Sequence, residues 1–295
     1  MAHRDIQISV TNAFLSAMFK VVYVLALEQK PEESIRSIVD LFPFIEKYCP
    51  GNFNVAQLID SIAMNSIKDI QLTVNLLEEA QKYSDKYPDI MLLRGNLACM
   101  FHALAYTKPL ESEERILAMV QAETLFNTVV DIEDNCSASV VDFSCLLINQ
   151  CRFEEAAEKL DRFIESELKK RSASSLHCFY KKEATVLDDT LQREVKVHGK
   201  FAVNSMSMAY YLLVKCVIKT DLLTADKAVY SKILQYFTEH CNRLNESSSF
   251  SLLGYAYLLV NIYPAAHEAF EKALTMCDGA TKLIQENIAV CSQHL

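Results

Sequence analysis

The sequence predicts an all-α fold, a solenoid of helical hairpins, and three observations favour it. Residues 250–273 place large, small and aromatic residues at the spacing of a helix–turn–helix unit, and weaker copies of this spacing recur earlier in the chain. The 295 residues are 51% hydrophobic but include only 5 Gly and 6 Pro, which leaves little material for the turns of a sheet-rich domain. We expect about six helix pairs and a C-terminal capping helix.

Two amphipathic helices are predicted at the N-terminus, over residues 8–27 and 32–48. The second follows Pro31, which suits a helix start, and Pro43 should kink it. The first is apolar, but it contains Lys20 and no cleavage-site pattern follows it. We therefore expect a repeat helix there, and neither a signal peptide nor a membrane segment.

Three hairpins should follow, each with a small residue where its two helices cross. They are predicted over residues 55–87, residues 91–129 and residues 140–164. The second carries an insertion around Pro109, and the third has Ser144 at the crossing. A further pair, residues 202–220 and 224–240, is predicted from apolar periodicity alone.

No repeat fits residues 165–200, so the chain divides into residues 1–168, an interruption at 169–200, and residues 201–295, as one continuous array. Asp188 is expected to cap a short helix that runs through Val197. The interruption also carries clustered cations among aromatic residues, at Lys169, Lys170, Arg171, Lys181 and Lys182. Such a patch can bind phosphates or nucleic acid. A solvated loop is the alternative, and the net charge of −9 favours it.

The last predicted hairpin has the most regular pattern. Its first helix presents one stripe of large residues around Gly254, which is expected to lie opposite Ala266 in the second helix. Pro264 should begin that second helix. A final helix over residues 280–292 has polar residues among apolar ones, as expected of a helix that caps the end of an array.

Seven positions of this hairpin resemble the signature of the tetratricopeptide repeat. They are Phe250, Leu253, Gly254, Tyr257, Ala266, Phe270 and Ala273. The resemblance implies a non-enzymatic scaffold or adaptor that binds a peptide or helix of another protein on the concave face of the array. First helices line that face in the family, which makes Asn96, Ser251, Tyr255 and Leu258 the candidate binding residues. Tyr255 could equally pack against a neighbouring repeat.

Some family members hold the acidic tails of chaperones with basic residues on their first helices. The matching positions here are not basic, as Ser248, Leu252, Val141 and Asp142 illustrate, which argues against chaperone tails. Two alternatives stay open for the function. The segment 169–182 could bind nucleic acid or a phosphate ligand, or the chain could be the repeat region of a larger multidomain protein.

The sequence contains none of the common motifs of catalysis, metal binding or nucleotide binding. The 10 cysteines lack the paired spacing of zinc ligands, and the 7 histidines form no His-Glu-x2-His motif. The glycines lie too far apart for a phosphate-binding loop. We therefore expect no enzyme, cofactor, metal or membrane partner, although an all-helical enzyme could assemble a site from distant residues. Cysteines that are expected to form no disulfides favour a cytoplasmic location, with the nucleus as the alternative.

Overall fold

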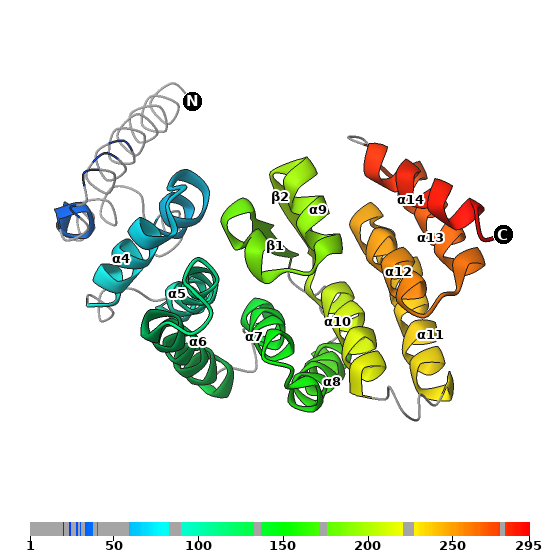
Figure 1. The fold of residues 1–295 in the computed structure, drawn as a ribbon, viewed down its shortest axis with the longest axis horizontal. Coiled ribbons are helices and arrows are strands. Elements are labelled where there is room, and N and C mark those ends of the chain that lie inside the picture. The colour runs from blue at the N-terminus through cyan, green and yellow to red at the C-terminus, as the bar shows by residue number, and fades with distance from the viewer. Residues whose placement is uncertain are drawn as a thin grey trace, which may run out of the picture. The chain divides into compact units, whose positions relative to one another are not determined.

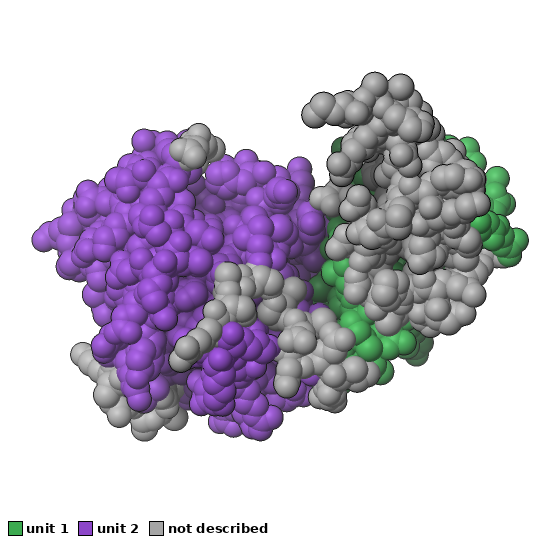
Figure 2. Space-filling model, turned by 180° about the vertical axis from the view of Figure 1, so that it is seen from behind, with its two compact units in different colours: residues 1–129 green, residues 130–295 purple. Residues whose placement is uncertain are grey.

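A computed structural model gives a mostly helical protein (Figure 1). It describes residues 59–82, 90–132, 137–170, 176–220, 227–277 and 281–295, with a few positions before residue 59. The helices predicted at 8–27 and 32–48 fall largely outside these ranges. The chain divides into two compact units, residues 1–129 and 130–295, which Figure 2 colours separately. Within the described residues, no helix is both long and apolar enough to cross a membrane.

The described helical segments of the first unit fall in the ranges predicted for the 55–87 and 91–129 hairpins. In chain order they are η1 (Ser61–Ser66), α4 (Ile70–Gln81), α5 (Ile90–Ala105) and α6 (Glu113–Ile132), whose last residues belong to the second unit. Asp69 caps α4 by accepting a hydrogen bond from the Leu72 N–H at 2.8 Å. Helix α4 packs against α5. The predicted insertion is the short turn around Pro109 that joins α5 to α6.

The second unit contains further hairpins and a final helix. Its described elements are α7 (Ser137–Asn149), α8 (Phe153–Lys170), β1 (Leu176–Tyr180), η3 (Lys181–Val186), α9 (Asp189–His198), β2 (Lys200–Asn204), α10 (Ser205–Thr220), α11 (Lys227–Leu244), α12 (Ser247–Leu259), α13 (Tyr263–Thr275) and α14 (Lys282–Ser292). Helix α10 packs on both α7 and α8, and α12 packs on both α10 and α11. Each of these first helices therefore contacts both helices of the hairpin before it.

The α12–α13 hairpin has the close helix contact that its sequence predicts, with one difference. Pro264 lies in the first turn of α13, as expected. A Cβ atom added to Gly254 would lie 2.7 Å from the ring of Phe270, and its three nearest neighbours all belong to that ring. The nearest side chain to Gly254 is thus that of Phe270, one turn after the Ala266 that was predicted to lie opposite it. Because Phe270 is fully buried, its ring occupies the space beside the glycine.

The stretch between α8 and α10 contains two strands that the all-α prediction did not include. Strand β1 pairs antiparallel with β2, from Leu176 opposite Asn204 to Tyr180 opposite Lys200. Less buried and buried side chains alternate along β1 and along the first four residues of β2, as they do in a sheet with one covered face. Helix α10 therefore begins at Ser205, three residues later than predicted, because residues 202–204 belong to β2.

The helix between these strands matches its prediction. The Asp188 carboxylate caps α9 by accepting a hydrogen bond from the Leu191 N–H at 3.0 Å. Gly199 ends the helix in the left-handed region with φ 77, a conformation that glycine adopts without strain. The whole stretch from residue 176 to residue 204, called the insert below, is thus an ordered subdomain and contains no long loop.

Candidate functional site

The insert covers the first helices of the second unit. Its β1, η3 and α9 elements reach α7, α10, α12 and α14 through polar contacts, and β2 packs against α10 and α12. The first helices are the elements that the family resemblance assigned to peptide binding. Part of their surface is therefore occupied by a segment of the same chain.

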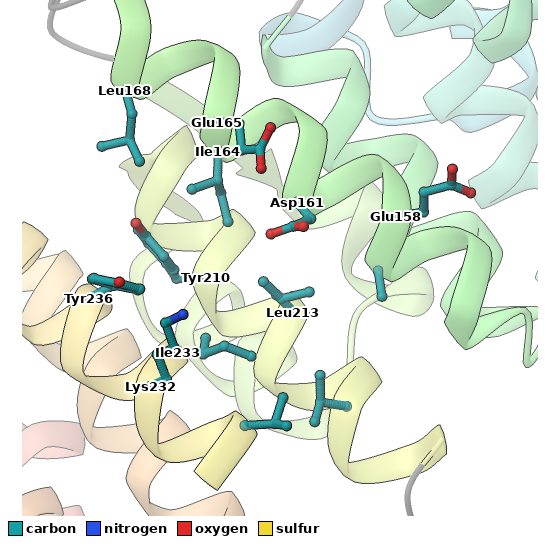
Figure 3. A pocket seen from close by; sticks show the side chains of 13 residues that line it. Glu158, Asp161, Ile164, Glu165, Leu168, Tyr210, Leu213, Lys232, Ile233 and Tyr236 are labelled. Carbon is teal, nitrogen blue, oxygen red and sulfur yellow. The ribbon is translucent and has the colours of Figure 1, made fainter.

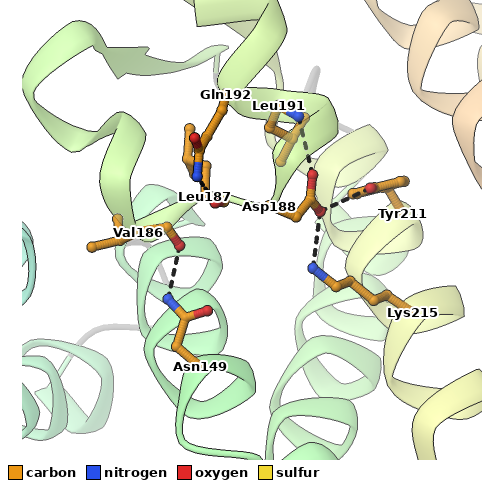
Figure 4. Close-up of polar contacts among 8 residues, drawn as sticks. All are labelled: Asn149, Val186, Leu187, Asp188, Leu191, Gln192, Tyr211 and Lys215. Atoms are coloured by element: carbon orange, nitrogen blue, oxygen red, sulfur yellow. Dashed lines mark hydrogen bonds and ion pairs between the residues drawn. The ribbon is translucent and has the colours of Figure 1, made fainter. Parts of the chain in front are cut away.

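Asp188 joins the insert to α10 (Figure 4). While one carboxylate oxygen caps α9, the other accepts hydrogen bonds from the Tyr211 hydroxyl and the Lys215 ammonium, each at 2.9 Å. Nearby, the Asn149 amide donates to the Val186 carbonyl at 2.7 Å and so attaches α7 to η3. Burial, followed by the charge of Asp188, raises the pKa of Tyr211 and keeps this phenol a donor. The polar groups of this cluster therefore form hydrogen bonds with one another.

A cavity of about 10 Å³ lies beside the Asp188 cluster, next to Cys145. That volume has room for about one water molecule, too little for a substrate. Burial, with the charge of Asp142 next, raises the pKa of the Cys145 thiol well above its ordinary value. The thiol is therefore protonated at neutral pH and a poor nucleophile.

A second buried cluster joins β1 and η3 to α7. His177 Nε2 lies 3.1 Å from Asp142 Oδ1, without hydrogen-bond geometry, and the Glu183 carboxylate accepts the Tyr180 N–H at 2.7 Å. Burial lowers the pKa of His177, but the neighbouring Asp142 and Glu183 carboxylates together outweigh this and the pKa is raised overall. Burial, helped by Asp142, raises the pKa of Glu183 to about 7. The cluster therefore contains two buried titratable side chains, those of His177 and Glu183.

A serine and a histidine also meet in the interior, where β2 and α10 pack on α11 and α12. His240 Nε2 lies 3.1 Å from the Ser207 hydroxyl, which in turn donates to Ser249 at 2.8 Å. Because the Ser207 hydroxyl donates its hydrogen bond to Ser249, it accepts one from the imidazole N–H. In nucleophile activation the roles are reversed, since the imidazole accepts the proton of the serine. Burial lowers the pKa of His240 to about 4. Ser207 is fully buried, so these residues form a packing contact.

Two of the four predicted peptide-binding residues are buried. Tyr255 is buried: its hydroxyl donates to Glu194 on α9 at 2.6 Å and accepts from Asn287 on α14 at 2.9 Å. Ser251 is also buried, and Leu258 is half-buried. The expectation that Ser251 and Tyr255 face a partner is therefore corrected, because both are buried and the Tyr255 hydroxyl is bonded to α9 and α14. Asn96, in the first unit, donates to the Asp60 carboxylate.

The predicted basic patch is distributed over two elements. Lys169 and Lys170 lie exposed in the last turn of α8, where cations complement the helix dipole, and Lys170 pairs with Glu167 at 3.1 Å. Lys181 is exposed and Lys182 half-buried, both in η3. Arg171 lies outside the described residues.

An apolar groove opens between α8 and α11, with α10 as its floor (Figure 3). Its volume is about 960 Å³. Three of its apolar side chains are strongly exposed: Leu168 at 49%, Val229 at 43% and Tyr236 at 46%. The lining residues are Ala157, Glu158, Asp161, Ile164, Glu165, Leu168, Tyr210, Leu213, Val217, Val229, Lys232, Ile233 and Tyr236.

Sequence reasoning missed this groove. It depends on the separation of α8 from α11 across α10, and no periodicity within one helix encodes that distance. A local signal was present, because Leu168, Val229 and Tyr236 are apolar residues outside the buried stripes of their helices. Such residues indicate a second apolar face only when their neighbours in space are known.

The fold and the site define a mostly helical protein with a self-covered face and an exposed apolar groove. No protein-family model matches the chain, and no curated protein matches it either. Across the described ranges, the His, Cys, Asp and Glu side chains form no group that could hold a metal ion.

Proposed function

We propose that this protein is a non-enzymatic scaffold or adaptor, built as a tetratricopeptide-like array, and that it binds a peptide or helix of another protein in the groove between α8 and α11. The packing of α10 on α7 and α8, and of α12 on α10 and α11, supports an array of hairpins. The groove replaces the concave-face residues as the binding site, because α9 and α14 cover Tyr255. The cytoplasmic location remains a prediction from the cysteines.

The groove is the observation that carries this proposal. Leu168, Val229 and Tyr236 come from two helices and all line one hollow. Exposed apolar surface is unfavourable in water by roughly 25 cal/mol per Å², and a partner that covers it recovers that free energy. Hollows of about 300–1,000 Å³ hold small ligands, and this groove is at the upper end of that range. It is open and long enough for the side chains of a peptide.

Two matched valine substitutions test the groove as the binding site. Val229 lines it and is 43% exposed, while Val290 on α14 lies outside it and is 45% exposed. We expect Val229→Asp to reduce captured partner at least about tenfold, because the carboxylate would be desolvated on binding. Val290→Asp should capture as much as the unmodified protein. Capture is measured by quantitative mass spectrometry, with circular dichroism to verify folding.

Equal capture by Val229→Asp, Val290→Asp and the unmodified protein would exclude the groove. Equal losses in the two folded variants would point to an effect of added charge on the whole surface. In either case the proposed binding site is wrong.

A further inference from the structure

The walls of the groove differ in charge. Helix α8 contributes Glu158, Asp161 and Glu165, which are three and four residues apart and therefore lie along one side of that helix. Figure 3 shows these carboxylates on the α8 side and Lys232 on the α11 side. One edge of the apolar floor is thus acidic.

Within the described residues, two of the three acids have no paired counter-charge. Glu158 pairs with Arg162 on its own helix. Asp161 and Glu165 are exposed and form no ion pair or hydrogen bond within the part of the chain that the structure describes. Across the groove, the Lys232 ammonium lies 5.8 Å from the centre of the Tyr236 ring. A cation that entered along α8 would therefore meet two available carboxylates.

The walls also indicate the conformation of the occupant. All three are helices, whose backbone N–H and C=O groups are already paired within each helix. An extended peptide would leave its own backbone groups unpaired on the apolar floor, whereas a helix pairs them internally. The lining of α8 runs from Ala157 to Leu168, about 16 Å at 1.5 Å per residue. That length matches about three turns of a bound helix.

We propose that the groove binds an amphipathic α-helix of a partner protein, about three turns long, with Lys or Arg on the flank that faces α8. Its apolar stripe covers Leu168, Val229 and Tyr236, and its cations pair with Asp161 and Glu165. This inference rests on the proposed function and specifies the chemistry of the partner at that site.

A display library of random 16-residue peptides is the probe, selected on the full chain. Selected peptides are then measured by fluorescence anisotropy against four variants. Asp161→Lys/Glu165→Lys reverses the acidic edge, and Val229→Asp disrupts the floor. Val290→Asp is the control for the floor. Glu154→Lys/Glu268→Lys makes the same change in net charge at exposed positions outside the groove lining.

We expect the selected peptides to be rich in Lys and Arg, with apolar residues every three or four positions. Their affinity should fall at least about tenfold in Asp161→Lys/Glu165→Lys and in Val229→Asp, stay within about twofold in both controls, and weaken as salt rises.

The failures of the two proposals are distinguishable. Peptides that depend on Val229 but lack a basic excess, or that bind the charge-reversed variant equally well, would overturn the basic helix and leave the groove as a binding site. Peptides with alternating apolar residues would overturn the helical conformation in the same way. A selection without any peptide that depends on Val229 also overturns this inference, while the partner-capture experiment decides the proposed function separately.

Discussion

Tyr255 illustrates how one side chain links three elements of this protein. From α12 it donates to Glu194 on α9 and accepts from Asn287 on α14. Burial, followed by the charge of Glu194, raises the pKa of Tyr255, so the phenol stays protonated and keeps both bonds at neutral pH. Burial also raises the pKa of Glu194, although its bond from Tyr255 opposes this. Substituting Tyr255 therefore tests stability before it tests binding.

We expect Tyr255→Phe to lower the free energy of unfolding by about 1–3 kcal/mol, because Glu194 and Asn287 would lose a buried partner. Tyr263→Phe is the matched control, since its hydroxyl donates to Asn261 at an exposed site, at 3.3 Å. That change should stay within about 0.5 kcal/mol. Urea unfolding of both variants measures the difference, and equal effects would contradict the role given to Tyr255.

The raised pKa of Glu183 should make the stability of the protein depend on pH. Its pKa is about 7 in the folded protein against an ordinary 4.5, so the folded state keeps this proton to higher pH than the unfolded chain. Stability from the bound proton is thus lost as pH rises from about 4.5 to about 7. His177, whose pKa is also raised, contributes in the same direction: its stabilisation is present at low pH and lost as pH rises.

We expect Glu183→Gln to remove the contribution of the carboxylate. The stability of this variant relative to the unmodified protein should increase between pH 5 and pH 8 by on the order of 2 kcal/mol. Urea unfolding at both pH values measures it. A difference that does not change with pH would mean that Glu183 has an ordinary pKa.

At the scale of elements, the insert is attached to the hairpins by side chains at the ends of its own helix and strands. Asp188 caps α9 and also binds α10. Asn204, the last residue of β2, accepts the Met206 and Ser207 N–H groups and so starts α10. Each of these residues caps the start of one helix and also belongs to or contacts a second element. Substituting either residue should therefore destabilise more than a single helix.

Asp188→Ala should destabilise the protein by about 2–4 kcal/mol, since α9 loses its cap and the mostly buried Lys215 loses its counter-charge. Asp189→Ala is the control, because Asp189 is exposed in the first turn of α9 and should contribute only about 0.5 kcal/mol. Thermal and urea unfolding would measure both changes. Similar losses in the two variants would contradict the role given to Asp188.

At the scale of the whole molecule, net charge bears on the alternative function. The chain carries 29 Lys and Arg against 38 Asp and Glu, and its net charge is −9. A protein of this charge repels nucleic acid at long range unless cations concentrate on one face. The cations of the 169–182 segment that the structure describes lie at the end of α8 and in η3.

We expect purified protein to show no retention on immobilised RNA or duplex DNA at low salt. The Lys181→Ala/Lys182→Ala variant provides the comparison. Retention of the unmodified chain that decreases as salt rises, and that this variant lacks, would instead support binding through the basic segment. Column retention across a salt gradient measures both proteins.

Local signals in the sequence determined the helices and several of their ends. Apolar periodicity predicted the hairpins of the second unit, Asp188 predicted the start of α9, and Pro264 predicted the start of α13. These signals succeed because a cap or a helical stripe acts over one or a few turns of the same segment. Residues 202–204 were assigned to a helix instead of a strand, because a strand is stabilised by its partner, which lies about 24 residues earlier.

Tertiary structure alone decided which surfaces remain open. Tyr255 bonds to Glu194 across 61 residues of sequence, so its burial depends on where the insert packs. The groove likewise depends on the spacing of α8 and α11 over α10, which side-chain packing between helices determines. The sequence therefore determined a largely helical chain of hairpins by itself. Contacts between distant segments determined that part of the predicted peptide-binding face is covered and that an apolar groove with one acidic edge is exposed.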